Sequence, residues 1–176
     1  MKATKGLQNR IIEAERFLSQ MGRANLPRVY LLDNDRPEQH KAMLQEATSP
    51  ATSQPVPARF LKRYELENYL LDAQAIAANI AEELQLHTED PKPPTMEEVR
   101  LFMEEMLATE DQRLYPLGKG EPPHDTCKGS AILNRVFERF GLGEDRKTEH
   151  GRSIARRMEQ TGGLQEIWEV VADIFA

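Results

Sequence analysis

A short apolar segment, residues 28–32, limits the fold more than any other part of the chain. It reads Arg-Val-Tyr-Leu-Leu and is followed directly by Asp33-Asn34-Asp35. The run has the length of a strand and no polar alternation, which is typical of a strand buried on both faces of a parallel sheet. Residues 59–62 form a second candidate strand. Helical patterns at 5–21 and from Pro37 to Ala47 flank the first strand, so the order favours an α/β layer.

The rest of the chain has the spacing of helices. Thr95 followed by Glu98 predicts a capping box at the start of a helix over 95–112. Gly162-Gly163 separates the last two expected helices. The other expected helices cover 64–83, 130–140, 152–160 and 164–175. The sequence therefore predicts a small parallel sheet with a helical C-terminal extension, divided into an α/β part over 1–88 and a helical part over 89–176 that packs on it.

Composition and charge restrict the class of protein. The 176 residues carry a net charge of −6 and a single cysteine, Cys127. No apolar run approaches the roughly 20 residues that span a bilayer, so we expect no membrane association and a cytoplasmic location. A protein that grips a phosphate backbone passively normally has a basic surface. An acidic chain acts on nucleic acid more readily when its carboxylates hold a divalent cation.

Two acidic junctions follow the candidate strands. Asp33 and Asp35 come at the end of the first strand, where open α/β sheets bind ligands. Glu65, Glu67 and Asn68 follow the second strand where a helix is expected to begin. Both junctions also have plain structural explanations, since Asp-x-Asp is ordinary turn chemistry and acidic residues are favoured in a first helical turn. If the two junctions share one sheet edge, a cleft for a hard cation becomes more plausible than either junction suggests separately.

These residues resemble a known family. Residues 29–35, Val-Tyr-Leu-Leu-Asp-Asn-Asp, and residues 63–71, Arg-Tyr-Glu-Leu-Glu-Asn-Tyr-Leu-Leu, look like the Toprim domain of the overcoming-lysogenization-defect (OLD) family of nucleases. Members of that family are metal-dependent DNA nucleases, usually fused to an ABC-type ATPase and often linked to phage defence. The resemblance covers about residues 25–85 and implies a small, Rossmann-like parallel sheet.

The resemblance implies a role for each matching residue. Asp33, Asp35 and Glu65 would be ligands of Mg²⁺ or Mn²⁺, and Glu67 would act in catalysis within the same acidic cluster. Lys128 resembles the late lysine of the family, which would contact the scissile phosphate or stabilise charge in the transition state. Its plain alternative is a solvent-exposed loop lysine.

One part of the family pattern has no counterpart in this sequence. Toprim sites also use a glutamate after a first strand, whereas the carboxylates before Asp33 are Glu13 and Glu15 in a helical pattern. A phosphate-binding Gly-x-x-x-x-Gly-Lys-Ser/Thr loop is also absent from the sequence. We therefore expect a truncated Toprim-like sheet that cuts DNA poorly or not at all alone. An ABC-type ATPase or an upstream Toprim half would act in trans, and an oligomer is compatible with this reading.

Several other features have plain interpretations. The run from His124 to Cys127 suggests a zinc or Cys–His site, but the remaining histidines are scattered singly, so an incidental thiol is favoured. Arg152, Arg156 and Arg157 are most simply a solvated helix face. The stripe Met96, Met103 and Met106 is most simply core. Residues 164–175, with Ile167, Trp168, Val171 and Phe175, are expected to dock on the domain or to bind a partner.

Three functions remain open at this level. The first is a Mg²⁺-dependent DNA endonuclease fragment that hydrolyses phosphodiester bonds. The second is a non-catalytic Toprim-like remnant or regulatory partner subunit. The third is an unrelated helical interaction module. Divalent-metal binding separates the third function from the other two, and metal-dependent nicking of DNA separates the first from the second.

Overall fold

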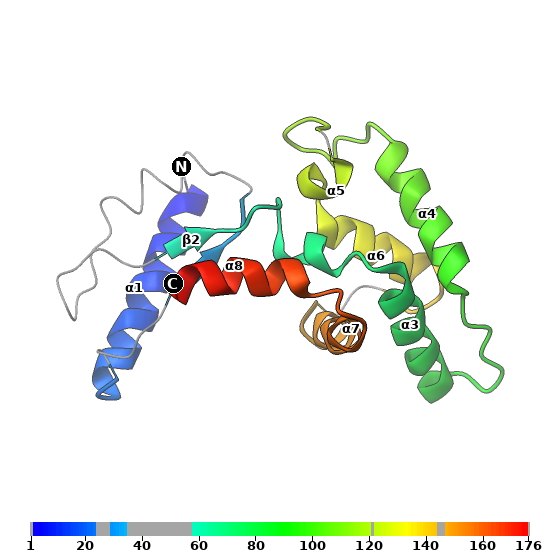
Figure 1. The fold of residues 1–176 in the computed structure, drawn as a ribbon, viewed down its shortest axis with the longest axis horizontal. Coiled ribbons are helices and arrows are strands. Elements are labelled where there is room, and N and C mark those ends of the chain that lie inside the picture. The colour runs from blue at the N-terminus through cyan, green and yellow to red at the C-terminus, as the bar shows by residue number, and fades with distance from the viewer. Residues whose placement is uncertain (1, 24–28, 35–57, 121, 144–146, 176) are drawn as a thin grey trace. The chain divides into compact units, whose positions relative to one another are not determined.

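The fold was analysed in a computed structural model that describes residues 2–23, 29–34, 58–120, 122–143 and 147–175 (Figure 1). These residues form two compact units, the first over Met1–Leu61 and the second over Lys62–Ala176. Each unit is described by itself. The expected helix from Pro37 to Ala47, and Asp35 with it, lie outside the described residues.

The first unit begins with helix α1 (Lys2–Gln20). Ile11 and Glu15 lie on its buried face, and the carboxylate of Glu15 accepts a hydrogen bond of 2.7 Å from the hydroxyl of Tyr30. That bond compensates for burying a carboxylate, which is costly when it has no donor. Gly22 ends the helix with a φ of 68°, a left-handed conformation that favours glycine. The helical pattern predicted over 5–21 is therefore confirmed as a helix that ends next to Gly22.

Two short strands follow α1 in the chain. Strand β1 (Tyr30–Leu32) pairs in parallel with β2 (Ala58–Phe60), with Tyr30 opposite Ala58. The backbone N–H of Leu61 donates to the carbonyl of Leu32 at 2.8 Å and extends the pairing by one bond. The prediction of a small parallel sheet is thus confirmed for these two strands. The described part of the chain is mixed α/β and mostly helical. A Toprim-like fold beyond this pair stays a prediction.

The second unit is helical in its described residues. A 3-10 helix, η1 (Leu66–Leu70), is followed by α3 (Ala73–His87), α4 (Met96–Ala108) and the short α5 (Pro123–Thr126). The last helices are α6 (Gly129–Arg139), α7 (Lys147–Thr161) and α8 (Gln165–Phe175). Among the described helices none is long and apolar enough to cross a membrane.

One apolar core holds the second unit together. Helices α3 and α4 pack side by side, α6 packs against η1 and α4, and α7 packs against α3 and η1 (Figure 1). The fully buried side chains of this core include Ile76, Ile80, Val99, Leu114, Tyr115, Ile132, Leu133, Val136, Phe137 and Ile154. Residues on both sides of position 88 share this core, while the functional division into 1–88 and 89–176 stays a prediction.

The helix predicted over residues 64–83 is wrong as a single element. The backbone leaves helical geometry at Leu71, with φ −79° and ψ 57°, and a new helix begins after Asp72. The carboxylate of Asp72 accepts a hydrogen bond of 2.7 Å from the backbone N–H of Ala75, so it caps α3. An aspartate at this position competes with the helical backbone and favours a helix start. Leu66, the first residue of η1, is 47% exposed and does not belong to the buried core.

Two other predictions about helices have mixed outcomes. The capping box is confirmed, because the hydroxyl of Thr95 accepts from the N–H of Glu98 at 3.2 Å and the Glu98 carboxylate accepts from the N–H of Thr95 at 2.7 Å. Met103 and Met106 are buried in the core as predicted, but Met96 is 48% exposed. Met96 lies at the first residue of α4, where the helix has not yet reached the core.

Helix α8 is attached to the second unit at its beginning. Leu164 is buried and Ile167 packs against the core, whereas Trp168 is 54% exposed. Gly162 has a φ of 79° between α7 and α8, so the predicted break at Gly162-Gly163 is confirmed. The start of α8 therefore docks on its own unit, as the sequence suggested, and Trp168 does not take part in that docking.

Candidate active site at the junction of two segments

Two segments far apart in the chain meet in the second unit: residues 63–70 and residues 124–130, called here the junction. Its centre is Asn68, whose side chain is fully buried. The amide nitrogen Nδ2 donates to the carbonyls of His124 at 2.5 Å and Cys127 at 2.8 Å, and it lies 3.2 Å from Cys127 Sγ. The amide oxygen accepts from the N–H of Glu65 at 2.9 Å. Because both ends of the amide are bonded, its burial is compensated.

Gly129 allows the two segments to touch. A Cβ atom placed on Gly129 would lie 2.6 Å from the backbone nitrogen of Asn68 and 2.8 Å from the carbonyl carbon of Glu67. No side chain fits there without a shift, since the two nearest atoms belong to the backbone and the third, Asn68 Oδ1 at 2.9 Å, is held by a hydrogen bond. Glycine at this position therefore follows from a close approach of two backbones rather than from a turn.

Glu65 caps a helix that lies 65 residues further along the chain. Its Oε2 accepts a hydrogen bond of 3.0 Å from the backbone N–H of Ser130 and another of 2.8 Å from the Ser130 hydroxyl. Ser130 lies in the first turn of α6, where backbone N–H groups have no partner inside the helix. A carboxylate is favoured there by the helix dipole as well.

Arg63 connects the two segments of the junction to each other, through Asp125, and to α8, through Glu166. Its guanidinium lies 2.5 Å from the carboxylate of Glu166 and 3.4 Å from that of Asp125, and Nη1 donates to the carbonyl of Asn68 at 2.9 Å. The guanidinium also lies 4.9 Å from the centre of the Tyr69 ring. These contacts hold segment 63–70 from both sides and leave the Arg63 charge balanced by carboxylates.

The two residues predicted for catalysis lie on the touching segments. Glu67 is half-buried and Lys128 is exposed. Glu67 belongs to η1, and Lys128 directly precedes α6, with its backbone N–H donating to the carbonyl of Leu114 at 2.7 Å. Since the backbone at Glu67 approaches Gly129, the structure brings these two predicted residues to the same part of the unit.

The predicted metal ligands belong to two different units. Asp33 is exposed directly after β1 in the first unit, and Asp35 lies outside the described residues. Glu65 and Glu67 belong to the second unit, and the shared sheet edge expected for these carboxylates stays a prediction. Within the described part of the chain, no group of three or more His, Cys, Asp or Glu side chains is placed to hold a metal ion.

The hydrogen bonds of Glu65 bear on whether its carboxylate is available to a metal ion. Its Oε2 already accepts two hydrogen bonds from Ser130, so this oxygen is used by the fold. A metal ligand needs a free lone pair directed at the cation. Glu65 would therefore ligate a cation through its other carboxylate oxygen, and Asp33, Asp35, Glu65 and Glu67 keep their predicted roles as hypotheses.

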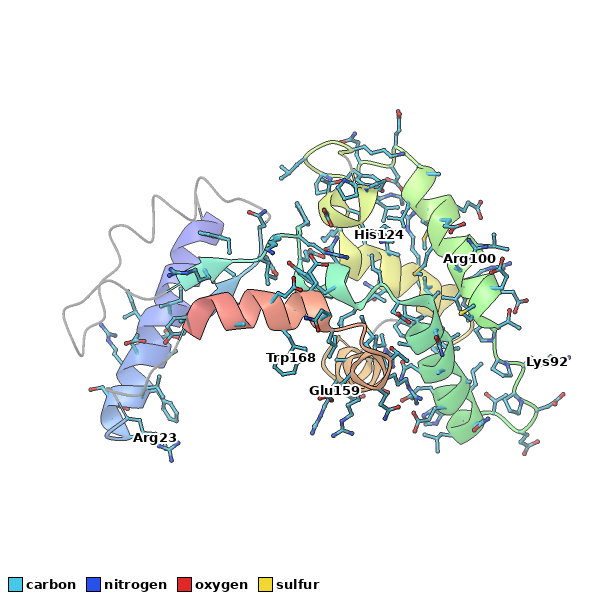
Figure 2. All side chains as sticks on the ribbon, viewed as in Figure 1. Arg23, Lys92, Arg100, His124, Glu159 and Trp168 are labelled. Atoms are coloured by element: carbon cyan, nitrogen blue, oxygen red, sulfur yellow. The ribbon has the colours of Figure 1, made fainter. Side chains whose placement is uncertain are left out.

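The alternative Cys–His site is disfavoured by the environment of its thiol. Cys127 is fully buried, and this desolvation raises its pKa to about 12. His124, labelled beside α5 in Figure 2, has a lowered pKa because of burial and then of the nearby Arg63 charge. A thiol that stays protonated at neutral pH is a poor nucleophile. Of the three arginines on α7, Arg152 and Arg156 are exposed and Arg157 pairs with Glu82.

Some functional positions were missed from the sequence. The sequence predicts only that Ser130 begins a helix and that Glu166 belongs to another, yet Ser130 bonds to Glu65 and Glu166 pairs with Arg63. It places Asn68 beside two acidic residues and does not identify the carbonyls that Asn68 contacts. A polar Asn inside a Leu/Tyr-rich run, and Gly-Ser after a loop lysine, were the available signals.

Comparison of the chain with protein-family models, with curated proteins and with solved structures gives no match. The resemblance to Toprim nucleases therefore depends on residues 29–35 and 63–71 and on Lys128. The proposed function of the chain depends on the chemistry of its side chains and on the geometry of the junction.

Proposed function

We propose that this chain carries part of a Mg²⁺- or Mn²⁺-dependent DNA endonuclease site of the Toprim kind, which hydrolyses phosphodiester bonds. The observation that supports the proposal is the junction itself. It joins the acidic segment 63–70 to the segment of Lys128 through Asn68, Glu65 and Gly129. A catalytic carboxylate and a phosphate-binding lysine are needed close together in such a site.

Each residue has a defined part in the proposal. Lys128 contacts the phosphate, since its side chain is exposed and cationic at the start of α6. The resemblance assigns Asp33, Asp35 and Glu65 to the divalent cation and Glu67 to catalysis, and Glu65 also caps α6 through Ser130. The cation would neutralise phosphate charge and lower the pKa of an attacking water.

The charge of the chain is consistent with this division of labour. A net charge of −6 opposes passive capture of DNA by the protein surface. Binding then depends on a few local cations, among which Lys128 is exposed. Arg63 is a weaker candidate for the phosphate, because Glu166 and Asp125 already neutralise it.

The alternative is a non-catalytic Toprim-like remnant or a regulatory partner subunit. The observation that favours it is the use of Glu65 Oε2 as a cap for α6, which gives one oxygen of a predicted metal ligand a structural role. In either case we propose DNA as the partner, with an ABC-type ATPase or a further Toprim half supplied in trans. A cytoplasmic location and a part in phage defence belong to the same proposal.

Nicking of supercoiled plasmid DNA distinguishes the two candidates. Purified chain is incubated with Mn²⁺ alongside Asp33→Ala and Lys128→Gln variants of unchanged helicity. Nicking by the wild type that both variants lose supports the endonuclease. Mn²⁺ binding without nicking supports the remnant or regulatory subunit. A chain that neither binds Mn²⁺ nor nicks DNA contradicts both.

A further inference from the structure

We infer that Asn68 is a positioning residue that fixes Lys128 for contact with a DNA phosphate. This inference rests on the phosphate role proposed for Lys128. Asn68 does not touch the substrate in this account. It acts through the backbone of residues 124–128, to which its buried amide is bonded.

The loop before Lys128 is held by hydrogen bonds from two sides. The Asn68 amide donates to the carbonyls of His124 and Cys127 on that loop. The N–H of Lys128 is held from another side by the carbonyl of Leu114 at 2.7 Å. The peptide unit that joins Cys127 to Lys128 is therefore bonded at both its carbonyl and its N–H.

Replacement of Asn68 by aspartate would remove the donors that hold this loop. Aspartate has the same shape as asparagine but has no N–H groups, so a carboxylate would face the carbonyls of His124 and Cys127. Buried acceptors facing one another repel and remain without donors. The loop must move away, and Lys128 moves with it. The same change at Asn79, which is also buried but lies on α3, leaves the junction intact.

Gly129, on the other side of the same contact, offers a second variant. Alanine at position 129 would place a Cβ atom 2.6 Å from the backbone nitrogen of Asn68. This change separates the segments without altering any charge. Gly129→Ala therefore displaces Lys128 while the Asn68 side chain keeps its amide.

The test is a double-mutant cycle in DNA affinity, measured by fluorescence anisotropy with a short labelled duplex in Mg²⁺-free buffer. The proteins are wild type, Lys128→Gln, Asn68→Asp and the double variant, with Asn79→Asp as the matched control. Loss of one phosphate contact lowers affinity roughly fivefold to tenfold at about 0.1 M salt and makes the negative slope of log K against log salt shallower by about one.

We expect Asn68→Asp to weaken binding about as much as Lys128→Gln, and the double variant to bind no more weakly than either single variant. Urea unfolding of the same proteins should still register the destabilisation by Asn68→Asp in the Lys128→Gln background. Asn79→Asp should leave DNA affinity unchanged. Where Asn68→Asp fails to fold by circular dichroism, Gly129→Ala takes its place in the cycle with the same expected outcome.

Two results would overturn the inference, and they differ in what they say of the proposed function. If Lys128→Gln weakens DNA binding but Asn68→Asp and Gly129→Ala do not, Asn68 does not position Lys128, and the phosphate role of Lys128 stands. If Lys128→Gln has no effect on affinity or on the salt slope, the proposed phosphate role fails and the positioning role fails with it.

Discussion

Glu65 Oε2 accepts hydrogen bonds from both the backbone N–H and the hydroxyl of Ser130, at 3.0 and 2.8 Å, although 65 residues separate the two in sequence. The contact fixes the start of α6 to the segment that leads into η1. A residue that the sequence predicts as a metal ligand thereby contributes to the fold of the second unit. Structural and catalytic requirements at Glu65 are separable by substitution.

We predict that Glu65→Ala destabilises the second unit by about 1–2 kcal/mol, because α6 loses the acceptor for its first turn. Glu65→Gln keeps an amide oxygen at the same place and should cost less. Ser130→Ala removes only the hydroxyl bond and is the matched control. Urea unfolding measures all three. Equal stability of wild type and Glu65→Ala would show that the cap contributes nothing.

A second prediction concerns the contact between backbones at Gly129. Gly129→Ala should lower the free energy of unfolding by about 1–3 kcal/mol, because the added Cβ atom meets backbone rather than a movable side chain. The control is Gly151→Ala in α7, whose Cβ atom would lie 3.4 Å from Leu70 Cδ1, an ordinary contact. That change should be neutral or stabilising by up to about 1 kcal/mol, from helix propensity. Similar losses in both variants would refute the explanation.

The sequence was informative where the signal is local. A run of apolar residues predicted the parallel pairing of β1 with β2, and the Thr95/Glu98 spacing predicted a capping box that the structure confirms. The break before α3 was missed because the stripe of Leu and Tyr residues continues across it. There the side chain of Asp72 decides the helix start through one hydrogen bond, which apolar periodicity does not register.

The site was less predictable because its partners are distant in sequence. The resemblance selected Glu65, Glu67 and Lys128, and the structure places all three at the junction. The role of Asn68 depends on carbonyls 56 and 59 residues away, so no spacing rule identifies it. The relation of Asp33 to this junction stays a prediction, since Asp33 lies in the first unit.

A third prediction follows from the buried Cys127. Desolvation raises its pKa to about 12 from an ordinary value of 9.0, so between these values the unfolded thiol has lost its proton while the folded thiol keeps it. Stability therefore falls as pH rises above about 9, by at most about 1.4 kcal/mol per pH unit. Tyr115, whose pKa burial raises to about 12, adds a fall that begins at higher pH.

The measurement is the free energy of unfolding of wild type and Cys127→Ala between about pH 8 and 10.5. The variant should lose stability less steeply in this range, because the contribution of the thiol is removed while that of Tyr115 remains. Identical slopes would mean that the thiol is not desolvated in the folded chain.

A fourth prediction concerns how α8 is attached. Glu166→Gln weakens the pairing with Arg63, in which the two side chains are 39% and 23% exposed. Partly exposed ion pairs contribute about 0–1 kcal/mol, so global stability should change little. Local opening of α8 should become more frequent, as hydrogen exchange of its amides would register. Trp168, the single tryptophan of the chain, reports the same change by fluorescence. Unchanged exchange throughout α8 would mean that Leu164 and Ile167 suffice to hold it.

The proposed metal-dependent function is tested most directly by calorimetric titration of the chain with Mn²⁺. The proteins are wild type, the Asp33→Asn/Asp35→Asn double variant, and Glu13→Gln, an exposed carboxylate on α1, as the control. The account predicts that wild type and Glu13→Gln bind Mn²⁺ and gain thermal stability from it, because the cation binds the folded state. The double variant should lose both effects. Equal binding by all three proteins, or no binding by the wild type, would contradict the account.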